Sequence, residues 1–178
     1  MKKLLKILTL TLILSSLINV NLAQPVKNKK FEFSTSASIW NVKFEGTETE
    51  TVINLPVRLG YFVYKGLEIE AELFLTIPED EDLGFLFLGN FSYNFKVSEK
   101  LMPFILGGGG YGNSEQSFST VFDYGTNIFV INFGAGIKLL INESGAIRIE
   151  YRFTKYMADG EWFDRTDQNF FVGISIFF

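Results

Sequence analysis

The sequence predicts an all-β protein: an eight-stranded antiparallel up-and-down transmembrane β-barrel. Two observations carry this prediction. Eight segments alternate large apolar residues with small, polar or charged ones, and the connections between them are alternately short and long. A period of two is typical of a strand with one apolar face, and two classes of connection are typical of barrels that span a membrane.

The eight segments are rich in β-branched and aromatic residues, and helical spacing fits none of them. The alternation is plainest at 67–73 (LEIEAEL) and 147–153 (IRIEYRF), where charges occupy every second position. Each of these segments therefore has one apolar and one charged face. We expect strands at 31–40, 51–61, 67–76, 83–95, 102–112, 126–140, 146–154 and 169–178.

The connections fall into two groups. The short ones carry turn-forming residues such as Lys65-Gly66 and lie at 62–66, 96–101 and 141–145. The others are mostly longer and more polar and lie at 41–50, 77–82, 113–125 and 155–168. Because short turns alternate with long loops, both ends of the chain should lie with the short turns, on the periplasmic side of a membrane barrel.

The last predicted strand has one strongly apolar face, whereas Gly173 and Ser175 on its other face are small. The apolar face consists of Phe170, Val172, Ile174, Ile176 and Phe178. Terminal residues of soluble domains tend to be polar and loosely held, while the last strand of a membrane barrel closes the barrel and faces lipid. We interpret these five residues as an insertion and closure signal.

The first 23 residues have the features of a secretory signal peptide. Lys2, Lys3 and Lys6 precede an apolar run at 7–18, and a small residue, Ala23, ends the segment. Thr and Ser residues interrupt the run, which is shorter than the roughly 20 apolar residues of a spanning helix. We therefore expect a cleaved signal peptide at 1–23, a periplasmic tail at 24–30 and an outer-membrane barrel domain at 31–178, rather than a membrane anchor.

Composition excludes several classes of function. Without Lys2, Lys3 and Lys6, the 16 basic and 20 acidic residues become 13 and 20, so the net charge of −7 argues against nucleic acid as a partner. The chain has no cysteine and no histidine, which removes thiol chemistry and the commonest general base and metal ligand. We expect no enzyme activity and no cofactor.

The run at 107–110 (GGGG) lacks the Lys-Ser or Lys-Thr of a phosphate loop, so we interpret it as a bend within a strand.

Side-chain size predicts which face of each strand points inward. A soluble lipocalin-like barrel would turn its apolar face inward. A narrow eight-stranded lumen has room only for close-packed side chains, so we expect the small polar residues inside and the bulky apolar ones, such as Phe87 and Phe133, against lipid. Two aromatic girdles are expected from Trp40, Tyr61, Tyr64, Tyr93, Phe95, Tyr156 and Trp162.

Charged residues also fall on the predicted inner face, and their signs nearly cancel. The acids are Glu32, Glu68, Glu70, Glu72 and Glu150, and the bases are Arg58, Lys138, Arg148 and Arg152. Buried carboxylates without partners would repel one another and lose hydration. We expect Arg58 to face Glu68 or Glu70, with Arg148 and Arg152 reaching the same strand across the lumen. Because eight strands leave little free bore, a structural plug is favoured over a gated or proton-conducting channel.

The longer connections are acidic, with a summed charge of −11: −2 at 43–50, −4 at 79–82, −2 at 115–123 and −3 at 159–167. The densest run is Glu79, Asp80, Glu81 and Asp82. Hard oxygen ligands suit divalent cations. This rim is therefore a candidate for collecting such cations and bridging to lipopolysaccharide phosphates or a basic partner.

Three stretches resemble the small outer-membrane β-barrel family related to the membrane domain of OmpA and to OmpX: 103–112 (PFILGGGGYG), 147–154 (IRIEYRFT) and the strand that ends at Phe178. The resemblance implies a bacterial outer-membrane location and contact with outer-membrane lipids and lipopolysaccharide. It also implies insertion by the barrel-assembly machinery, which in this family reads the aromatic C-terminus. It brings no catalytic motif, and the peptidoglycan-binding domain of OmpA-like proteins is not in this sequence.

We therefore expect a non-enzymatic integral outer-membrane protein, structural or surface-interacting, with a salt-bridged lumen and acidic loops. One alternative is a surface adhesin or ligand-binding module that acts through the loops. Others are a narrow porin-like channel and a soluble lipocalin-like carrier.

Overall fold

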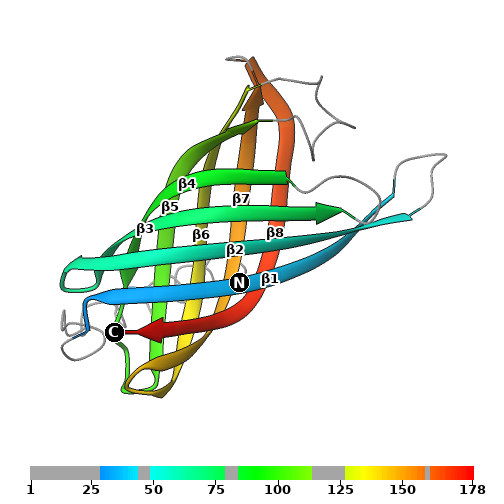
Figure 1. Cartoon of the computed structure of the whole chain (residues 1–178). Coiled ribbons are helices and arrows are strands. Elements are labelled where there is room, and N and C mark those ends of the chain that lie inside the picture. Colours follow the sequence, from blue (N-terminus) through cyan, green and yellow to red (C-terminus); the bar gives the residue numbers. More distant parts are fainter. Residues whose placement is uncertain (1–28, 44–48, 79–83, 114–126, 159–160) are drawn as a thin grey trace, which may run out of the picture.

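Eight antiparallel strands form a closed barrel in which each strand pairs with its sequence neighbours and β8 pairs with β1 (Figure 1). The computed structural model describes residues 29–43, 49–78, 84–113, 127–158 and 161–178. The strands are β1 (Phe31–Lys43), β2 (Thr49–Tyr64), β3 (Leu67–Pro78), β4 (Gly84–Asn94), β5 (Leu101–Asn113), β6 (Asn127–Asn142), β7 (Gly145–Ala158) and β8 (Glu161–Phe177). The predicted fold class is thus confirmed. The described residues include no helix long and apolar enough to cross a membrane.

The two ends of the barrel differ. We call the end with the connections β2–β3, β4–β5 and β6–β7 the turn end, and the opposite end the loop end. Phe178 also lies at the turn end, where its backbone carbonyl accepts hydrogen bonds from the N–H groups of Lys30 (3.2 Å) and Phe31 (2.9 Å). The acidic connections, including the run at 79–82, belong to the loop end, and most of their residues lie outside the described part of the chain.

Each predicted strand exists, but the prediction of a long connection at 155–168 is wrong. The β7–β8 hairpin remains paired there, with Lys155 opposite Thr166 and Ala158 opposite Glu161. The outward residues near the hairpin's end, Thr166 and Gln168, are exposed and polar. Hydropathy therefore does not alternate in this segment, although the backbone ladder continues. The hairpin continues the two strands, and Asp167 is an inward strand residue rather than a loop residue.

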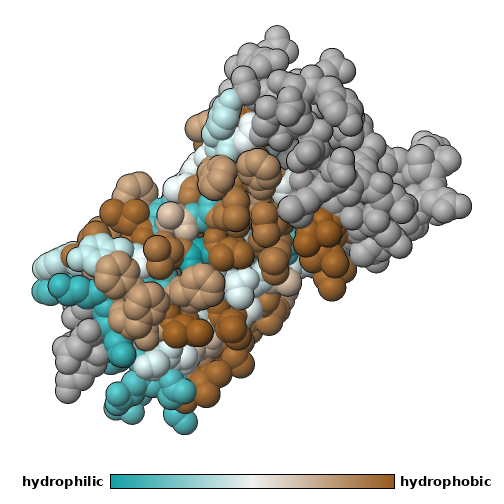
Figure 2. Space-filling view, viewed as in Figure 1, coloured by the Kyte–Doolittle hydropathy of each residue, from teal (hydrophilic) through white to brown (hydrophobic). Residues whose placement is uncertain are grey.

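The outer surface is a belt of exposed apolar side chains (Figure 2). Phe87 and Phe91 on β4 and Phe133 on β6 are each more than 60% exposed, while Leu88 and Asn90, on the other face of β4, are buried. Burial alternates without interruption along β4. Such a large continuous apolar surface is foreign to soluble monomers. The predicted orientation, bulky residues outward and small polar residues inward, is therefore confirmed for these strands.

The sequence led us to expect a lumen filled by small and charged residues. The structure shows large apolar side chains there as well. Two apolar clusters flank its polar middle. The cluster at the loop end consists of Phe74, Leu86, Leu88, Ile128, Val130, Tyr156 and Phe171. The cluster at the turn end consists of Phe62, Met102, Ala146 and Phe177. The prediction that Tyr156 belongs to an outer aromatic girdle is wrong, because its side chain points inward and is 2% exposed.

Glycines on the inner face make room for long lumen side chains. A Cβ atom on Gly136 would approach the Phe104 ring to 2.5 Å, and one on Gly60 would overlap the Glu68 carboxylate. A Cβ atom on Gly108 would overlap the backbone of β4. The glycine run at 107–110 lies within β5, as expected. These inward glycines let strands and large side chains approach closely where the barrel is narrow.

The seam between β1 and β8 is paired over only part of its length. Backbone pairing joins Glu32–Ala37 to Val172–Phe177. Beyond Ala37, β1 continues alongside β2 and β8 continues alongside β7, and within the described residues no backbone pair joins their loop-end halves. The two ribbons diverge there in Figure 1. A side-chain hydrogen bond from Ser38 Oγ to Asn169 Oδ1 (3.3 Å) links the strands where the ladder ends.

Candidate functional site

Nine charged lumen residues, all predicted from the sequence, come from five strands. β1 contributes Glu32, β2 Arg58 and β6 Lys138, while β3 and β7 contribute three residues each. The period of two places Glu68, Glu70 and Glu72 on the inner face of β3, and Arg148, Glu150 and Arg152 on the inner face of β7. All nine side chains are buried, none more than 3% exposed. The strands thus bring every charged residue predicted for the lumen into one layer across the bore.

Glu150 is the residue at which the arginines converge. It accepts hydrogen bonds from Arg58 Nη2 (3.4 Å), Arg148 Nε (3.0 Å) and Arg152 Nε (2.7 Å). Arg58 and the two β7 arginines share both of its oxygens. Three buried guanidinium groups would be strongly unfavourable without such an acceptor, since a buried charge must be paired and hydrogen-bonded.

Glu72 holds the layer together across the barrel. Arg152 donates to both of its oxygens, with distances of 2.6 and 3.0 Å, in the bidentate geometry that favours guanidinium–carboxylate pairs. Arg58 Nε donates to the same carboxylate at 2.8 Å. Asn90 Nδ2 completes the set at 2.9 Å. Both oxygens of Glu72 therefore accept hydrogen bonds.

The main partner of Arg58 differs from the expected ones. The sequence suggested Glu68 or Glu70; the ladder places Arg58 opposite Glu72, and Glu70 is a second, more distant ion-pair partner at 3.9 Å. The reason is that pairing continues to Tyr64 and Leu67, so only Lys65 and Gly66 form the turn, and a register shift follows between Phe62 and Tyr64. A turn of this kind changes which residues face each other, and no hydropathy pattern reports it.

The expectation that Arg148 and Arg152 reach β3 across the lumen matches the observed contacts. Arg148 donates to both oxygens of Glu70, at 3.2 and 3.4 Å, and to Glu32 at 3.3 Å. Its guanidinium carbon lies 4.5 Å from the centre of the Phe104 ring. An aromatic face beside a desolvated cation adds electrostatic stabilisation that the carboxylates do not supply.

Lys138 forms the turn-end border of the layer. Its ammonium group pairs with Glu32 and, at 3.1 Å, with Glu68. Three aromatic rings surround the same group, those of Phe104 (5.3 Å), Phe62 (5.7 Å) and Phe177 (6.0 Å). These rings therefore lie around the part of the ammonium group that no carboxylate contacts.

Glu68 is the surplus acid of the layer. The nine residues carry five acids and four bases, which leaves one negative charge without its own cation. Lys138, Ser92 and Asn94 all donate to Glu68 Oε2, whereas the buried Oε1 has no hydrogen-bond partner in the described residues. Glu70, Glu72 and Glu150 each contact at least two cations.

Uncharged side chains that the sequence placed on the inner face, without assigning them a role, turn out to be donors to the carboxylates. Ser175 Oγ donates to Glu32 (2.7 Å), and Asn132 Nδ2 donates to Asn90 (3.0 Å), which itself donates to Glu72. The small size of these residues was the signal that indicated their inward position. Their hydrogen-bond partners depend on the register between strands and were not predictable from side-chain size.

The remaining predicted residues lie away from the lumen. The five residues proposed as an insertion signal point outward from β8 and are exposed: Phe170, Val172, Ile174, Ile176 and Phe178. The run Glu79, Asp80, Glu81 and Asp82 lies outside the described residues, so its proposed role in cation binding stays a prediction. Among the residues that the structure describes, no cluster of acidic side chains could hold a metal ion.

Because Glu68 is the surplus acid and Glu72 is not, substitutions at these two positions of β3 should differ in their effect on stability. Glu72→Gln should lower the free energy of unfolding by about 3–5 kcal/mol, because it leaves Arg58 and Arg152 short of a buried counter-charge. Glu68→Gln should change it by less than about 1 kcal/mol, because Lys138 retains Glu32 and the charges become balanced. Urea-induced unfolding of the refolded barrel measures both. Equal losses in the two variants would contradict the assignment.

No protein-family model matches the chain, and no curated protein matches its sequence. Its fold is similar to those of several solved membrane barrels. Neisserial surface protein A aligns with a TM-score of 0.63 and 10% identity, over 83% of this chain and 97% of that one. The N-terminal barrel domain of Pseudomonas aeruginosa OprF gives 0.58 and 14%, over 84% and 98%. A de novo designed transmembrane β-barrel gives 0.51 and 15%, over 86% and 99%. The chain has the fold of the small eight-stranded outer-membrane β-barrels.

Proposed function

We propose that this chain is a non-enzymatic integral outer-membrane protein, a solid barrel that holds its loops at the cell surface. The exposed apolar belt supports membrane insertion, because residues such as Phe91 and Phe170 would be costly to leave in water. The predicted signal peptide at 1–23 and the likeness in fold to outer-membrane barrels support the same location. Lipid and lipopolysaccharide are its proposed surroundings, and the barrel-assembly machinery its proposed route of insertion.

The observation that carries the proposal is the filled lumen. A layer of buried ion pairs crosses the bore, and apolar clusters lie on both sides of it. An ion on its way through would have to part the Arg152–Glu72 pair and then pass apolar side chains such as Phe171. Both steps are unfavourable, since one breaks a buried pair and the other strips an ion of water. The barrel is therefore a scaffold for its loops rather than an ion channel.

The same burial supports a non-enzymatic role. Catalysis needs an acid, base or nucleophile that a substrate can reach. The nine lumen residues are buried, and their carboxylates accept hydrogen bonds from arginine, lysine, asparagine and serine side chains. Their stabilising role in the barrel accounts for their presence without any chemistry on a substrate.

A second candidate function is cation binding by the acidic loops, favoured by the run of four carboxylates at 79–82. Carboxylate oxygens are the ligands that Ca²⁺ prefers. Titration calorimetry of the refolded protein with Ca²⁺ should show heat that is lost when residues 79–82 are changed to Asn and Gln. Identical heats in the two proteins would reject this candidate.

We predict that the refolded protein shows heat-modifiable gel mobility and inserts into planar bilayers without a steady open-channel conductance. The double substitution Glu70→Ala with Arg148→Ala removes one acid and one base together, so it opens part of the ionic layer without changing the net charge. Because the Arg152–Glu72 pair and the apolar clusters remain, this variant should show no steady current either. Large stable currents through the wild-type barrel would overturn the scaffold model, and fractionation of the protein to the soluble periplasm would overturn the membrane location.

A further inference from the structure

Charged residues outside the lumen are sorted by sign between the two ends of the barrel. In the described part of the turn end, five lysines accompany two glutamates, so the side-chain charge there is +3. The lysines are Lys29, Lys30, Lys65, Lys96 and Lys100, and the glutamates are Glu99 and Glu143. The sequence of the opposite end is strongly acidic. A protein with a net charge of −4 thus presents a basic surface at the described turn end.

The lysines of the turn end are carried by ordered backbone. Lys65 forms the β2–β3 turn, and Asn94 N–H donates to the carbonyl of the adjacent Gly66 at 2.8 Å. Lys100 lies in the β4–β5 turn, where its N–H and that of Leu101 donate to Ser98 Oγ at 3.3 and 3.0 Å. The carbonyl of Lys30 accepts from Phe62 N–H at 2.8 Å. The positions of these residues are therefore fixed by the barrel.

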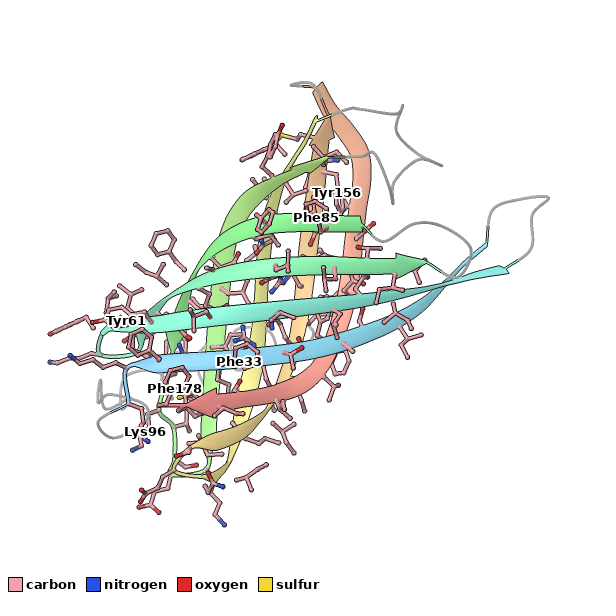
Figure 3. All side chains as sticks on the ribbon, viewed as in Figure 1. Phe33, Tyr61, Phe85, Lys96, Tyr156 and Phe178 are labelled. Atoms are coloured by element: carbon pink, nitrogen blue, oxygen red, sulfur yellow. The ribbon has the colours of Figure 1, made fainter. Side chains whose placement is uncertain are left out.

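Lys65 and Lys96 border the apolar belt directly. Lys65 follows Tyr64, whose side chain is 65% exposed, and its ammonium group lies 5.3 Å from the centre of the Tyr64 ring. Lys96 precedes Val97, which is 57% exposed. Figure 3 places Lys96 at the same end of the barrel as Tyr61 and Phe178, and Figure 2 shows hydrophilic residues adjoining the hydrophobic surface there. Tyrosine and lysine at the edge of an apolar belt mark the level of lipid headgroups.

We propose that the turn end binds the phosphate groups of anionic phospholipids in the leaflet that it faces, through Lys65, Lys96 and Lys100. This inference rests on the proposed membrane location and adds a lipid class to it. Phosphate diesters match the surface in charge and in chemistry, because an ammonium group is a compact donor for phosphate oxygens. The lysines lie beside the apolar belt, so a headgroup whose acyl chains contact that belt comes within reach of them.

Lipid selectivity measured by electron spin resonance tests the proposal on the full barrel in phosphatidylcholine vesicles. At low salt, spin-labelled phosphatidylglycerol should associate with the wild type about fivefold or more tightly than spin-labelled phosphatidylcholine. A fivefold preference is the effect of about one basic residue near a membrane surface. The variant with Lys65→Gln, Lys96→Gln and Lys100→Gln should lose this preference. Salt should weaken it in the wild type, since exposed charges are screened.

Matched variants make the result specific. Changing the same three lysines to arginine should retain the preference, and Glu99→Gln with Glu143→Gln should increase it. Equal association of the two lipids with the wild type, or a preference that survives in the glutamine variant, would overturn the proposal while leaving the membrane location intact. Failure of the wild type to insert into vesicles would instead contradict the membrane location and this inference with it. The wild type could instead show no lipid selectivity but bind purified cell-wall sacculi, with this binding lost in the glutamine variant. That outcome would assign the lysines to another partner and overturn the proposal.

Discussion

The convergence of three arginines on Glu150 constrains the rest of the structure. Arg58, Arg148 and Arg152 are buried, and each costs several kcal/mol to desolvate unless an acceptor lies within hydrogen-bonding distance. Glu150 and Glu72 supply those acceptors from opposite sides of the lumen. The distances are met only if the barrel is narrow. A narrow barrel in turn requires small residues where strands and long side chains approach, which explains inward glycines such as Gly134 and Gly60.

The ionic layer and the apolar clusters have complementary roles. Carboxylates satisfy the donors of the cations within the layer, while rings at its borders cover the faces that no carboxylate reaches, as Phe171 does for Arg152 at 5.5 Å. The clusters lie between the layer and both ends of the barrel. Exclusion of water strengthens each ion pair, because electrostatic interactions grow as the local dielectric constant falls. A filled lumen and a stable barrel are thus two results of one arrangement.

Much of this architecture is predictable from the sequence. The alternation at 67–73 reports both the strand and its charged inner face, and small residues such as Asn90 and Ser92 report the inward side of β4, which carries no charge. Phe171 and Phe177 were missed as lumen residues because Phe170 and Phe178 beside them are also apolar, so hydropathy does not distinguish the faces there. The Arg58–Glu72 pairing depends on an irregular hairpin turn, and the long β7–β8 hairpin depends on backbone pairing between polar residues. Neither leaves a pattern in one sequence.

The most direct test of the central claim is the stability of a Glu150→Gln variant against urea, compared with Glu143→Gln in the exposed β6–β7 turn. The substitution at Glu150 keeps the shape of the side chain and removes the charge that three arginines share. We predict a loss of about 3–5 kcal/mol in the free energy of unfolding for Glu150→Gln, and a change within about 0.5 kcal/mol for Glu143→Gln. A Glu150→Gln barrel as resistant to urea as the wild type would show that the ionic layer does not hold the structure together.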